Sequence, residues 1–289
     1  MKVSGFTFVR NAVKFDYPII ESITSILPLC DELVVCVGRS DDDTLALVES
    51  IASDKIKIIH SVWDDSLREG GKVLALETDK AFDAVAADSD WAFYIQADEV
   101  VHEKYLPTIK QAMEQHKDDR RVEGLLFNYT HFYGSYDYVG ASRLWYRHEI
   151  RIIRNDKAIR SYRDAQGFRK NNKKLNVKTI DACIYHYGWV KSPKFMQAKV
   201  RNFHSLYHDE QWLDKHVADS EKFDYSGIDV LARFTETHPA VICERIEHKN
   251  WTFEHDLSKN NRKLKEKILH FIEKFTGKRL FEYKNYKII

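Results

Sequence analysis

Two consecutive carboxylates follow an apolar run near the end of the first hundred residues. Trp91–Ile95 is hydrophobic, and Gln96–Glu99 comes directly after it, ending in Asp98 and Glu99. Carboxylate oxygens suit Mg²⁺ or Mn²⁺, and such a cation can neutralise a diphosphate and stabilise it as a leaving group. In the alternative interpretation, both side chains only cap a helix that begins near Lys104. The dipeptide alone does not decide between these two roles.

Common nucleotide-binding and hydrolase motifs are missing from the sequence. The loop after the first predicted strand, Arg10–Ala12, contains no glycine, which excludes the dinucleotide fingerprint G-x-G-x-x-G. Gly70–Val73 matches only a fragment of a P-loop and offers no hydroxyl group for magnesium. No G-x-S-x-G nucleophile motif occurs either. The chain is therefore not a typical dinucleotide-binding, P-loop or α/β-hydrolase protein.

Length and charge restrict the class of protein. The chain has 289 residues, which is enough for one large domain or for an α/β domain with a smaller appendage. Its 45 Lys and Arg residues are balanced by 44 Asp and Glu residues, so no global field attracts it to nucleic acid or to an anionic membrane. Hydrophobic residues make up 44% of the chain, as in a folded globular protein.

The cysteines and the apolar segments predict a cytoplasmic protein. The four cysteines form no C-x-x-C pair and no metal-ligand spacing, so we expect buried free thiols in a reducing compartment. The apolar run at the N-terminus is too short for a signal peptide. No segment approaches the roughly 18 apolar residues that a membrane-spanning helix needs.

Strands and helices alternate along the first hundred residues. Continuous apolar runs predict four strands, and apolar residues at helical spacing predict three helices between them. This alternation is typical of a parallel sheet with right-handed crossovers, in which ligands bind beyond the carboxyl ends of the strands. The loops that follow the four strands are therefore expected to form the site. The predicted strands are 3–9, 33–37, 56–62 and 91–96, and the predicted helices are 16–29, 44–52 and 72–87.

The pattern changes in the second half of the chain. Residues 124–130 and 150–153 predict further strands, and most of the later sequence is helical. We expect an α/β domain with a mostly parallel central sheet over residues 1–190, followed by a helical extension over residues 191–289.

One helix of this extension is Lys-rich and amphipathic. It covers residues 258–275, with Leu264, Ile268, Phe271 and Ile272 as its apolar stripe. Such a helix could touch an anionic membrane. We expect instead that the stripe packs against the domain below a solvated charged face, with at most peripheral contact with a membrane.

Four motifs in the first 110 residues resemble family 2 glycosyltransferases, which have the GT-A fold. Asn11 follows the first strand, as in that family. Gly38–Thr44 follows the second strand and is similar to the family's S-x-D-x-T turn. Trp63–Asp65 follows the third, and Gln96–Glu99 stands where lipopolysaccharide-core members carry D-A-D-E. The order of these motifs after four successive strands makes the resemblance fairly specific.

The resemblance implies an active site that is shared between distant segments. Asp98 and His186 are expected to hold Mn²⁺ or Mg²⁺, although a lone histidine beside two tyrosines is also explained by hydrogen bonding alone. Arg151 and Arg154 lie three residues apart on a predicted strand, so at most one of them can point into the site. The residues expected to line the nucleotide pocket are Asn11, Ser40, Asp42, Asp65 and Lys72.

An inverting transfer also needs a base that removes the proton of the acceptor hydroxyl, and carboxylates serve this purpose in the family. Asp164 is the candidate, because it falls between the arginine-containing strand and His186. Glu149 and Asp137 are alternatives, and Asp164 can also be a plain turn residue. Asp98 is the second residue expected to take part in catalysis, through the cation.

Two departures from the family pattern affect the expected cofactor and donor. Gln96 replaces the first Asp of the family's D-x-D motif, so a cation would be held weakly or would be dispensable. Val37 and Gly38 replace a pair of Asp residues, one of which contacts uracil in some relatives. UDP is therefore not assigned as the nucleotide of the donor.

The sequence thus predicts the transfer of a hexose-type sugar from a nucleotide-diphosphate donor to a hydroxyl of a glycan or lipid-linked glycan. The expected partners are this donor and this acceptor, and no nucleic acid. Two alternatives stay open: a nucleotidyltransferase, or a binding protein on a degenerate GT-A fold. The first usually needs a Gly-rich loop after the first strand, and Gln96 is the best support for the second.

Overall fold

The N-terminal half of the chain forms the parallel sheet that the sequence predicts. The structure is a computed structural model that describes residues 1–67, 70–217, 220–228, 230–258, 262 and 264–289. Four strands lie in the order β3-β2-β1-β4, and each neighbouring pair is parallel. Their bounds are Val3–Val9 for β1, Glu32–Gly38 for β2, Ile56–Ser61 for β3 and Trp91–Tyr94 for β4.

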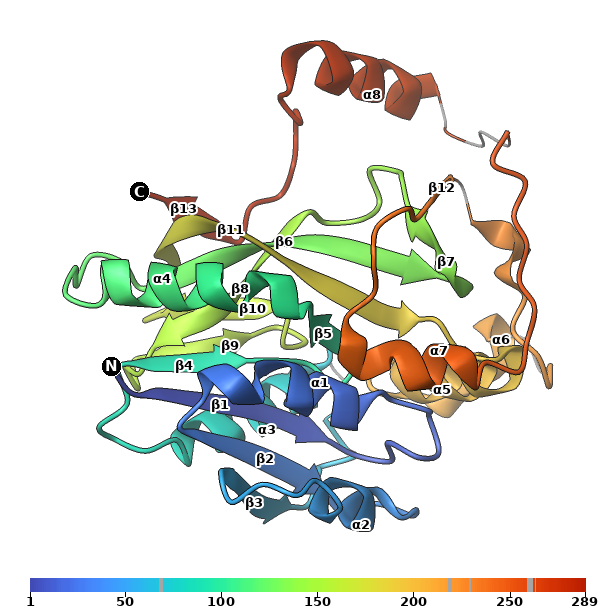
Figure 1. Ribbon diagram of the computed structural model, residues 1–289. Coiled ribbons are helices and arrows are strands. Elements are labelled where there is room, and N and C mark those ends of the chain that lie inside the picture. Colours follow the sequence, from blue (N-terminus) through green and yellow to red (C-terminus); the bar gives the residue numbers. More distant parts are fainter. Residues whose placement is uncertain (68–69, 218–219, 229, 259–261, 263) are drawn as a thin grey trace.

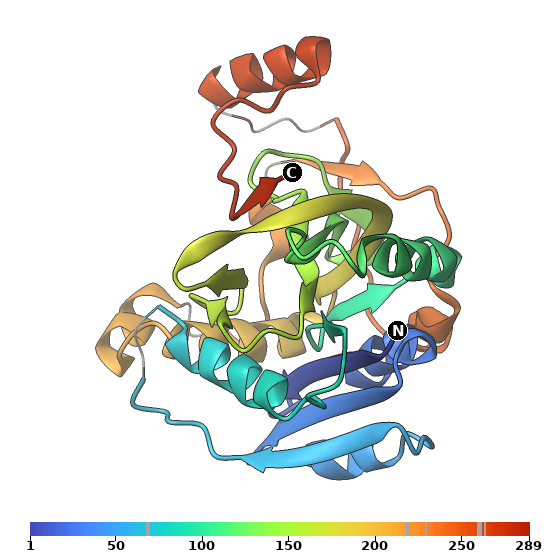
Figure 2. The same cartoon turned by 90° about the vertical axis from the view of Figure 1, so that its left-hand side faces the viewer.

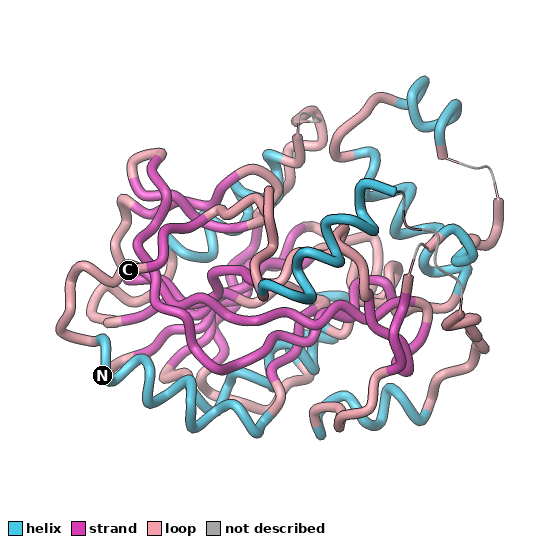
Figure 3. Tube along the Cα trace, turned by 90° about the horizontal axis from the view of Figure 1, so that it is seen from above, coloured by secondary structure: helices cyan, strands magenta, loops and turns pink. Residues whose placement is uncertain are grey.

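Helices cover both faces of this sheet, which explains its continuous apolar strands (Figure 3). Alternate residues of β2 point to opposite faces, so Val35 packs in the core with helix α1 and Val34 packs in the core with helix α3. The predicted helices are confirmed, with shorter bounds: α1 is Ile19–Ile26, followed by the 3-10 turn η1 at Leu27–Leu29, α2 is Thr44–Glu49, and α3 is Lys72–Asp83.

Beyond β4 the sheet is built from the second half of the chain, and there it becomes mixed and curls (Figure 2). The strand order continues as β4-β8-β6-β11-β10-β9, with β8 antiparallel to both β4 and β6, and β6 parallel to β11. Strand β7 follows β6 after a tight turn and pairs antiparallel with its end. The bounds are Gly124–Tyr133 for β6, Ser135–Gly140 for β7, His148–Arg154 for β8, Ile159–Tyr162 for β9, Gly167–Lys170 for β10 and Lys173–Trp189 for β11.

A short strand after β4 carries the two consecutive carboxylates. Strand β5, Glu99–Val101, pairs antiparallel with β11, and this register sets Glu99 opposite His186. The interpretation of Asp98 and Glu99 as helix caps is wrong, because His102 caps the 3-10 turn η2 at Glu103–Tyr105. Helix α4, Leu106–His116, begins only after that turn.

The C-terminal extension is mostly helical, as predicted, but it also returns two strands to the sheet. Strand β12 pairs with β7, and β13 pairs with β11. The expected boundary at residue 190 stays a prediction. The elements of the extension are α5 Pro193–Ser205, α6 Glu210–His216, η3 Tyr225–Gly227, β12 Leu231–Arg233, η4 Ala240–Ile242, α7 Cys243–Glu247, α8 Leu264–Thr276 and β13 Tyr286–Ile288.

Helix α8 differs from the expectation for the Lys-rich segment. It projects from the body of the molecule (Figures 1 and 2), and Phe271 is 62% exposed. The predicted packing of its apolar stripe is therefore wrong, and the first part of the predicted range, residues 259–261 and 263, lies outside the described residues. None of the helices that the structure describes has the length and apolar character needed to cross a bilayer. The four cysteines are free thiols. Cys30 and Cys36 are buried, as predicted, whereas Cys183 is partly buried and Cys243 is exposed.

Candidate active site

A cavity of about 1170 Å³ opens at the carboxyl end of the parallel strands. It lies where the topology of a parallel sheet predicts a ligand site. Its described lining comes from the loops after β1, β3 and β4, from the turn between β9 and β10, from β11 and from helix α5. The polar residues of the lining that matter below are Asn11, Gln96, Asp98, Asp164, His186 and Lys199.

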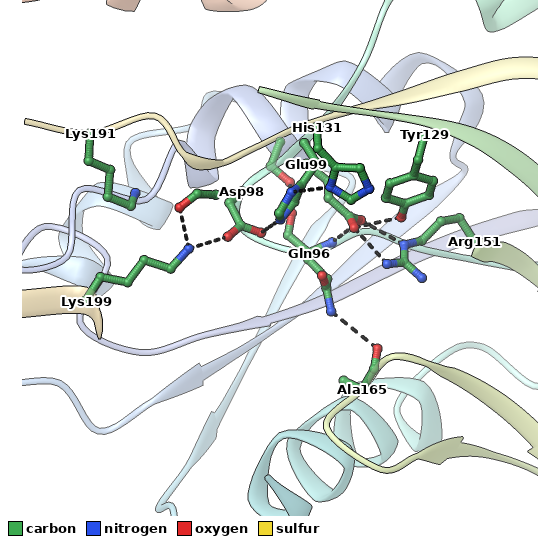
Figure 4. Close-up of polar contacts among 12 residues, drawn as sticks. Gln96, Asp98, Glu99, Tyr129, His131, Arg151, Ala165, Lys191 and Lys199 are labelled. Carbon is green, nitrogen blue, oxygen red and sulfur yellow. Dashed lines mark hydrogen bonds and ion pairs between the residues drawn. The ribbon is translucent and has the colours of Figure 1, made fainter. Parts of the chain in front are cut away.

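Asp98 lies at the centre of a cluster of charged and polar side chains (Figure 4). Its carboxylate accepts a hydrogen bond from Lys199 Nζ at 3.0 Å, and His186 Nε2 lies 3.7 Å from its other oxygen. Burial opposes ionisation of Asp98, but the charge of Lys199 and the hydrogen bond that it donates outweigh burial, so the pKa of Asp98 is lowered. Asp98 is therefore an ionised carboxylate that already has a cationic partner.

Lys191 adds a second ammonium group beside this cluster. The residue is fully buried at the end of β11, and its Nζ donates to the backbone carbonyl of Asp16. Burial, followed by the charge of Lys199, lowers the pKa of Lys191 to about 7. Lys199, together with Lys191 where that residue is protonated, makes this edge of the sheet a place that favours anions.

A chain of hydrogen bonds fixes the orientation of His186. His131 Nε2 lies 2.9 Å from the carbonyl oxygen of Tyr146, which can only accept, so this nitrogen carries a proton. Burial and His186 lower the pKa of His131 to about 3, so the ring is neutral and its Nδ1 is free to accept from His186 Nδ1 at 3.1 Å. His186 Nε2 is then the unprotonated nitrogen, and it faces Asp98.

The pair of donor atoms fits a divalent cation. Gly188 lies against both residues, and a Cβ at this position would stand 2.6 Å from His186 Nε2 and 2.7 Å from Asp98 Oδ2. Only glycine keeps this space free of protein atoms. Within the described ranges, no group of three His, Cys, Asp or Glu side chains is placed to hold a metal. A cation here would have two protein ligands, and phosphate and water would supply the others, as is common for Mg²⁺.

Glu99 is committed to structure rather than to a ligand. Both of its oxygens accept from Arg151, at 2.7 and 2.8 Å, and one also accepts from the hydroxyl of Tyr129 at 2.7 Å. Arg154 lies elsewhere: its guanidinium stacks 3.8 Å from the ring centroid of Trp91 and donates to backbone carbonyls after α4. Arg151 is in the described lining of the cavity and Arg154 is not, in agreement with the expectation that at most one of the two arginines can point into the site.

Gln96 occupies the position of the carboxylate that the motif would otherwise supply. Its Nε2 donates to the carbonyl of Ala165 at 3.3 Å and to the hydroxyl of Tyr94 at 3.4 Å. The amide thus ties the loop after β4 to the turn between β9 and β10. A carboxylate could not make the bond to Ala165, because it has no proton to donate.

Of the three candidate bases, only Asp164 lines the cavity. It lies between Arg163 and Ala165, which both have left-handed backbone conformations, and Tyr207 donates to its Oδ2 at 2.6 Å. Glu149 is buried, and burial raises its pKa to about 8. Asp137 lies on β7 and accepts from Ser135 at 2.9 Å, outside the described lining of the cavity.

The residues expected to bind the nucleotide are divided between the cavity and its supporting loops. Asn11 and Asp65 line the cavity, and Asp65 accepts from Arg10 Nη1 at 2.6 Å. Ser40, Asp42 and Lys72 are not in the described lining. Ser40 Oγ accepts from the backbone of Asn11, and Asp42 accepts from the backbone of Thr44 at 3.0 Å, so both shape loops. Lys72 is the exposed first residue of α3.

Sequence reasoning missed Lys199, Lys191, His131 and Tyr207. The three contacts of His131, Lys199 and Tyr207 with the predicted residues join positions 55, 101 and 43 residues apart. A local sequence pattern cannot reveal contacts between residues so far apart in the sequence. The one available signal was position, because Lys191 and Lys199 lie in the segment that follows the strand containing His186.

Comparison with known proteins gives limited matches. No protein-family model matches the sequence. A protein of Rickettsia felis described as an uncharacterized glycosyltransferase is 27% identical over 119 residues. The match covers 41% of this chain and 36% of the relative, so it spans about a third of the relative's length.

Three solved structures show low similarity to this chain. TarS of S. aureus is 17% identical, with 70% of this chain and 39% of that chain covered and a TM-score of 0.38. Glucosyl-3-phosphoglycerate synthase of Mycobacterium tuberculosis, solved with Mn²⁺, UDP and phosphoglyceric acid, is 21% identical over 45% and 43% of the two chains, with a TM-score of 0.30. A 4-diphosphocytidyl-2C-methyl-D-erythritol synthase of Anaerococcus prevotii is 10% identical over 66% and 91%, with a TM-score of 0.38.

These structural similarities are too low to assign an activity or a cofactor to the chain. The curated relative carries the description of a glycosyltransferase, and its similarity is weak but covers more than a hundred residues. The chain thus resembles a glycosyltransferase, as the motifs of its first half predict, whereas the likeness to lipopolysaccharide-core members stays a prediction.

Proposed function

We propose that this protein is a glycosyltransferase that moves a sugar from a nucleotide-diphosphate donor to a hydroxyl group of a glycan or lipid-linked glycan. The observation that carries the proposal is the cluster of Asp98, His186 and Lys199 in a cavity at the carboxyl edge of a parallel sheet. A diphosphate needs compensating positive charge as the bond to the sugar breaks. Lys199, and a cation held by Asp98 and His186, would supply it. The cavity is also large enough for a nucleotide-sugar.

Positive charge at the leaving group comes first from the chain itself. Lys199 can turn from Asp98 toward a phosphate oxygen, because a lysine ammonium sits on a flexible stem. Lys191 cannot move in this way, since it is buried, and it carries a charge only where it is protonated, because its pKa is about 7. Mn²⁺ or Mg²⁺, when bound by Asp98 and His186, would add Lewis-acid stabilisation of the same diphosphate.

Asp164 is the proposed base. In a direct transfer, the acceptor hydroxyl oxygen forms a bond to the anomeric carbon while the bond from that carbon to the diphosphate breaks. The hydroxyl proton passes to Asp164, and the nucleoside diphosphate leaves with the electron pair. Tyr207 donates to one oxygen of Asp164, which leaves the other oxygen to accept the proton. The anomeric configuration would be inverted, because a single displacement brings the hydroxyl to the face of the anomeric carbon opposite the leaving diphosphate.

Asn11 and Asp65 are proposed to contact the nucleotide, with the aromatic ring of Trp63 beside them. Trp63 lines the cavity, and the guanidinium of Arg10 lies 5.4 Å from its ring centroid. A flat ring next to a cation is a suitable surface for a nucleobase. Ser40 and Asp42 would act indirectly, by holding the loop that carries Asn11. Lys72 lies outside the described lining of the cavity, so it would contact the donor only if the donor extended beyond that lining.

A donor-hydrolysis screen tests this function. Purified protein is incubated with UDP-, GDP-, dTDP- and CMP-sugars, with manganese or with a chelator, and the released nucleotide is measured. We expect release from one donor class, with Asp98→Asn protein as the inactive control. Turnover of nucleoside triphosphates instead would indicate a nucleotidyltransferase. Neither turnover nor binding of any nucleotide would indicate a binding protein on a degenerate fold.

A further inference from the structure

Helix α8 presents a row of large apolar side chains to solvent. Leu264 is 75% exposed, Ile268 54%, Phe271 62% and Phe275 71%. Their spacing of three and four residues puts them on one face of the helix. This face, the α8 stripe, extends along about 20 Å of a 13-residue helix. Exposed Leu280 and Phe281 follow the helix within a few residues.

The opposite side of α8 is the one that contacts the body. Glu273 pairs with Arg143 at 2.5 Å and with Arg147 at 3.4 Å. Arg143 also donates to the backbone of Leu280, so the segments before and after Gly277 are anchored together. Glu273 lies about half a turn around the helix from Phe271 and Phe275. These ion pairs therefore fix the orientation that turns the stripe outward.

Lysines border the α8 stripe on both sides. Lys267 and Lys274 lie along one edge, and Lys265 lies along the other, by the 100° rotation per residue of a helix. All three are exposed. The two acidic residues of the helix, Glu266 and Glu273, lie on the opposite side, toward the body. An apolar face with only positive charge along its edges is the pattern of a helix that lies in a lipid interface.

We propose that α8 docks this protein onto the surface of an anionic lipid bilayer, with the helix axis parallel to the membrane. The phenylalanine, leucine and isoleucine side chains of the stripe would enter the boundary between headgroups and acyl chains, while the lysines reach the phosphate layer. A second copy of the chain fits this face less well. Two stripes in contact would bring rows of lysines together without an acidic row to pair with them.

Co-sedimentation with vesicles tests the proposal on the full-length protein. Vesicles of phosphatidylcholine alone are compared with vesicles that also contain phosphatidylglycerol, at low and at physiological salt. We expect the protein to pellet with the anionic vesicles and the bound fraction to fall as salt rises, because the lysine contribution is screened. Phe271→Glu/Phe275→Glu protein should bind on the order of tenfold more weakly, since two buried rings are replaced by anions.

The control variant is Leu76→Glu, which adds one negative charge at an exposed apolar position of α3. Its vesicle binding should match that of the unmodified protein, whereas Phe271→Glu alone should already weaken binding. Thermal unfolding checks that each variant is folded. Equal pelleting of unmodified and Phe271→Glu/Phe275→Glu protein would overturn the proposal. So would a dimer in light scattering that Phe271→Glu dissociates while vesicles bind none of the protein, because the stripe would then belong to a second copy.

Discussion

Asp98 is the residue on which the proposed chemistry depends most. Asp98→Asn keeps the size of the side chain but removes the charge that binds Lys199 and a cation. We expect the turnover of the transfer to fall by about a hundredfold or more. The control is Asp137→Asn, which changes a carboxylate outside the described lining of the cavity and should keep full activity. Full activity of Asp98→Asn protein would show that Asp98 does not hold the leaving group.

The ion pair between Asp98 and Lys199 also decides how Asp98→Asn affects the free energy of unfolding. In a cluster of carboxylates without a cationic partner, neutralising one carboxylate would stabilise the folded protein, because it removes repulsion between like charges. Here the substitution leaves the ammonium group of Lys199 without its anion, so the free energy of unfolding should fall, by about 1–3 kcal/mol. Urea unfolding at neutral pH measures this change.

Lys199 is expected to compete with a divalent cation for Asp98. Lys199→Met removes the competing charge while it keeps the length of the side chain. Mn²⁺, followed by electron paramagnetic resonance without any donor, should therefore bind severalfold more tightly, whereas turnover should fall because a charge at the diphosphate is lost. Lys194→Met, at an exposed position of the same helix, is the matched control. Unchanged Mn²⁺ affinity would contradict the competition.

The sequence predicted the centre of this site but not its surroundings. Asp98 and His186 each follow or end an apolar strand segment, and apolar strands are readable from the sequence. The partners of these residues are set by tertiary contacts, such as the register of β11 with β6 that brings His131 beside His186. Asp42 and Ser40 match their motif, yet their side chains bind backbone groups of loops.

At the scale of elements, Glu99 and Arg151 join β5 to β8 through a buried ion pair. Arg151→Met leaves an unpaired carboxylate in the core, so we expect a loss of about 3–5 kcal/mol in the free energy of unfolding. Glu99→Gln/Arg151→Met protein should recover a large part of this loss, because no uncompensated charge remains. Chemical denaturation of the two variants measures both values. If both variants lost the same free energy of unfolding, Arg151 would stabilise the fold through packing rather than through its charge.

The predictability of each element follows its length and burial. Strands β1, β2 and β4 are buried on both faces, and their apolar runs predicted them within a few residues. Strands β5, β12 and β13 have three residues each and exist because a neighbouring strand offers hydrogen bonds. Three residues are too few for a period to be recognised. Helix α8 was predicted from its period, but a period does not reveal which face meets solvent.

At the scale of the whole molecule, net charge conceals local asymmetry. The near balance of 45 basic and 44 acidic residues argued against an anionic membrane. That average does not describe α8, where lysines border the apolar stripe and the acidic residues turn toward the body. A docking surface of this size is decided by the charges within about 8 Å of it.

Glu149 should make the stability of the molecule fall as pH rises. Burial raises its pKa from 4.5 to about 8, so the folded protein keeps a proton that the unfolded chain releases. The stability that this proton supports is complete below pH 4.5 and is lost as pH rises through 8, by up to about 1.4 kcal/mol per pH unit. Glu149→Gln should flatten this part of the profile. Urea unfolding between pH 5 and 8.5 tests it, and parallel profiles would contradict it.

The binding of a nucleoside diphosphate at Asp98 and His186 tests the central claim most directly. Calorimetric titrations of UDP, GDP and dTDP into the protein, with and without Mn²⁺, are compared for the unmodified chain, Asp98→Asn and His186→Ala. The proposed function predicts that one diphosphate binds more tightly with Mn²⁺, that Asp98→Asn abolishes this dependence, and that His186→Ala weakens it. Diphosphate binding with the same affinity in all three proteins would show that the nucleotide lies elsewhere and would contradict the assignment of this site.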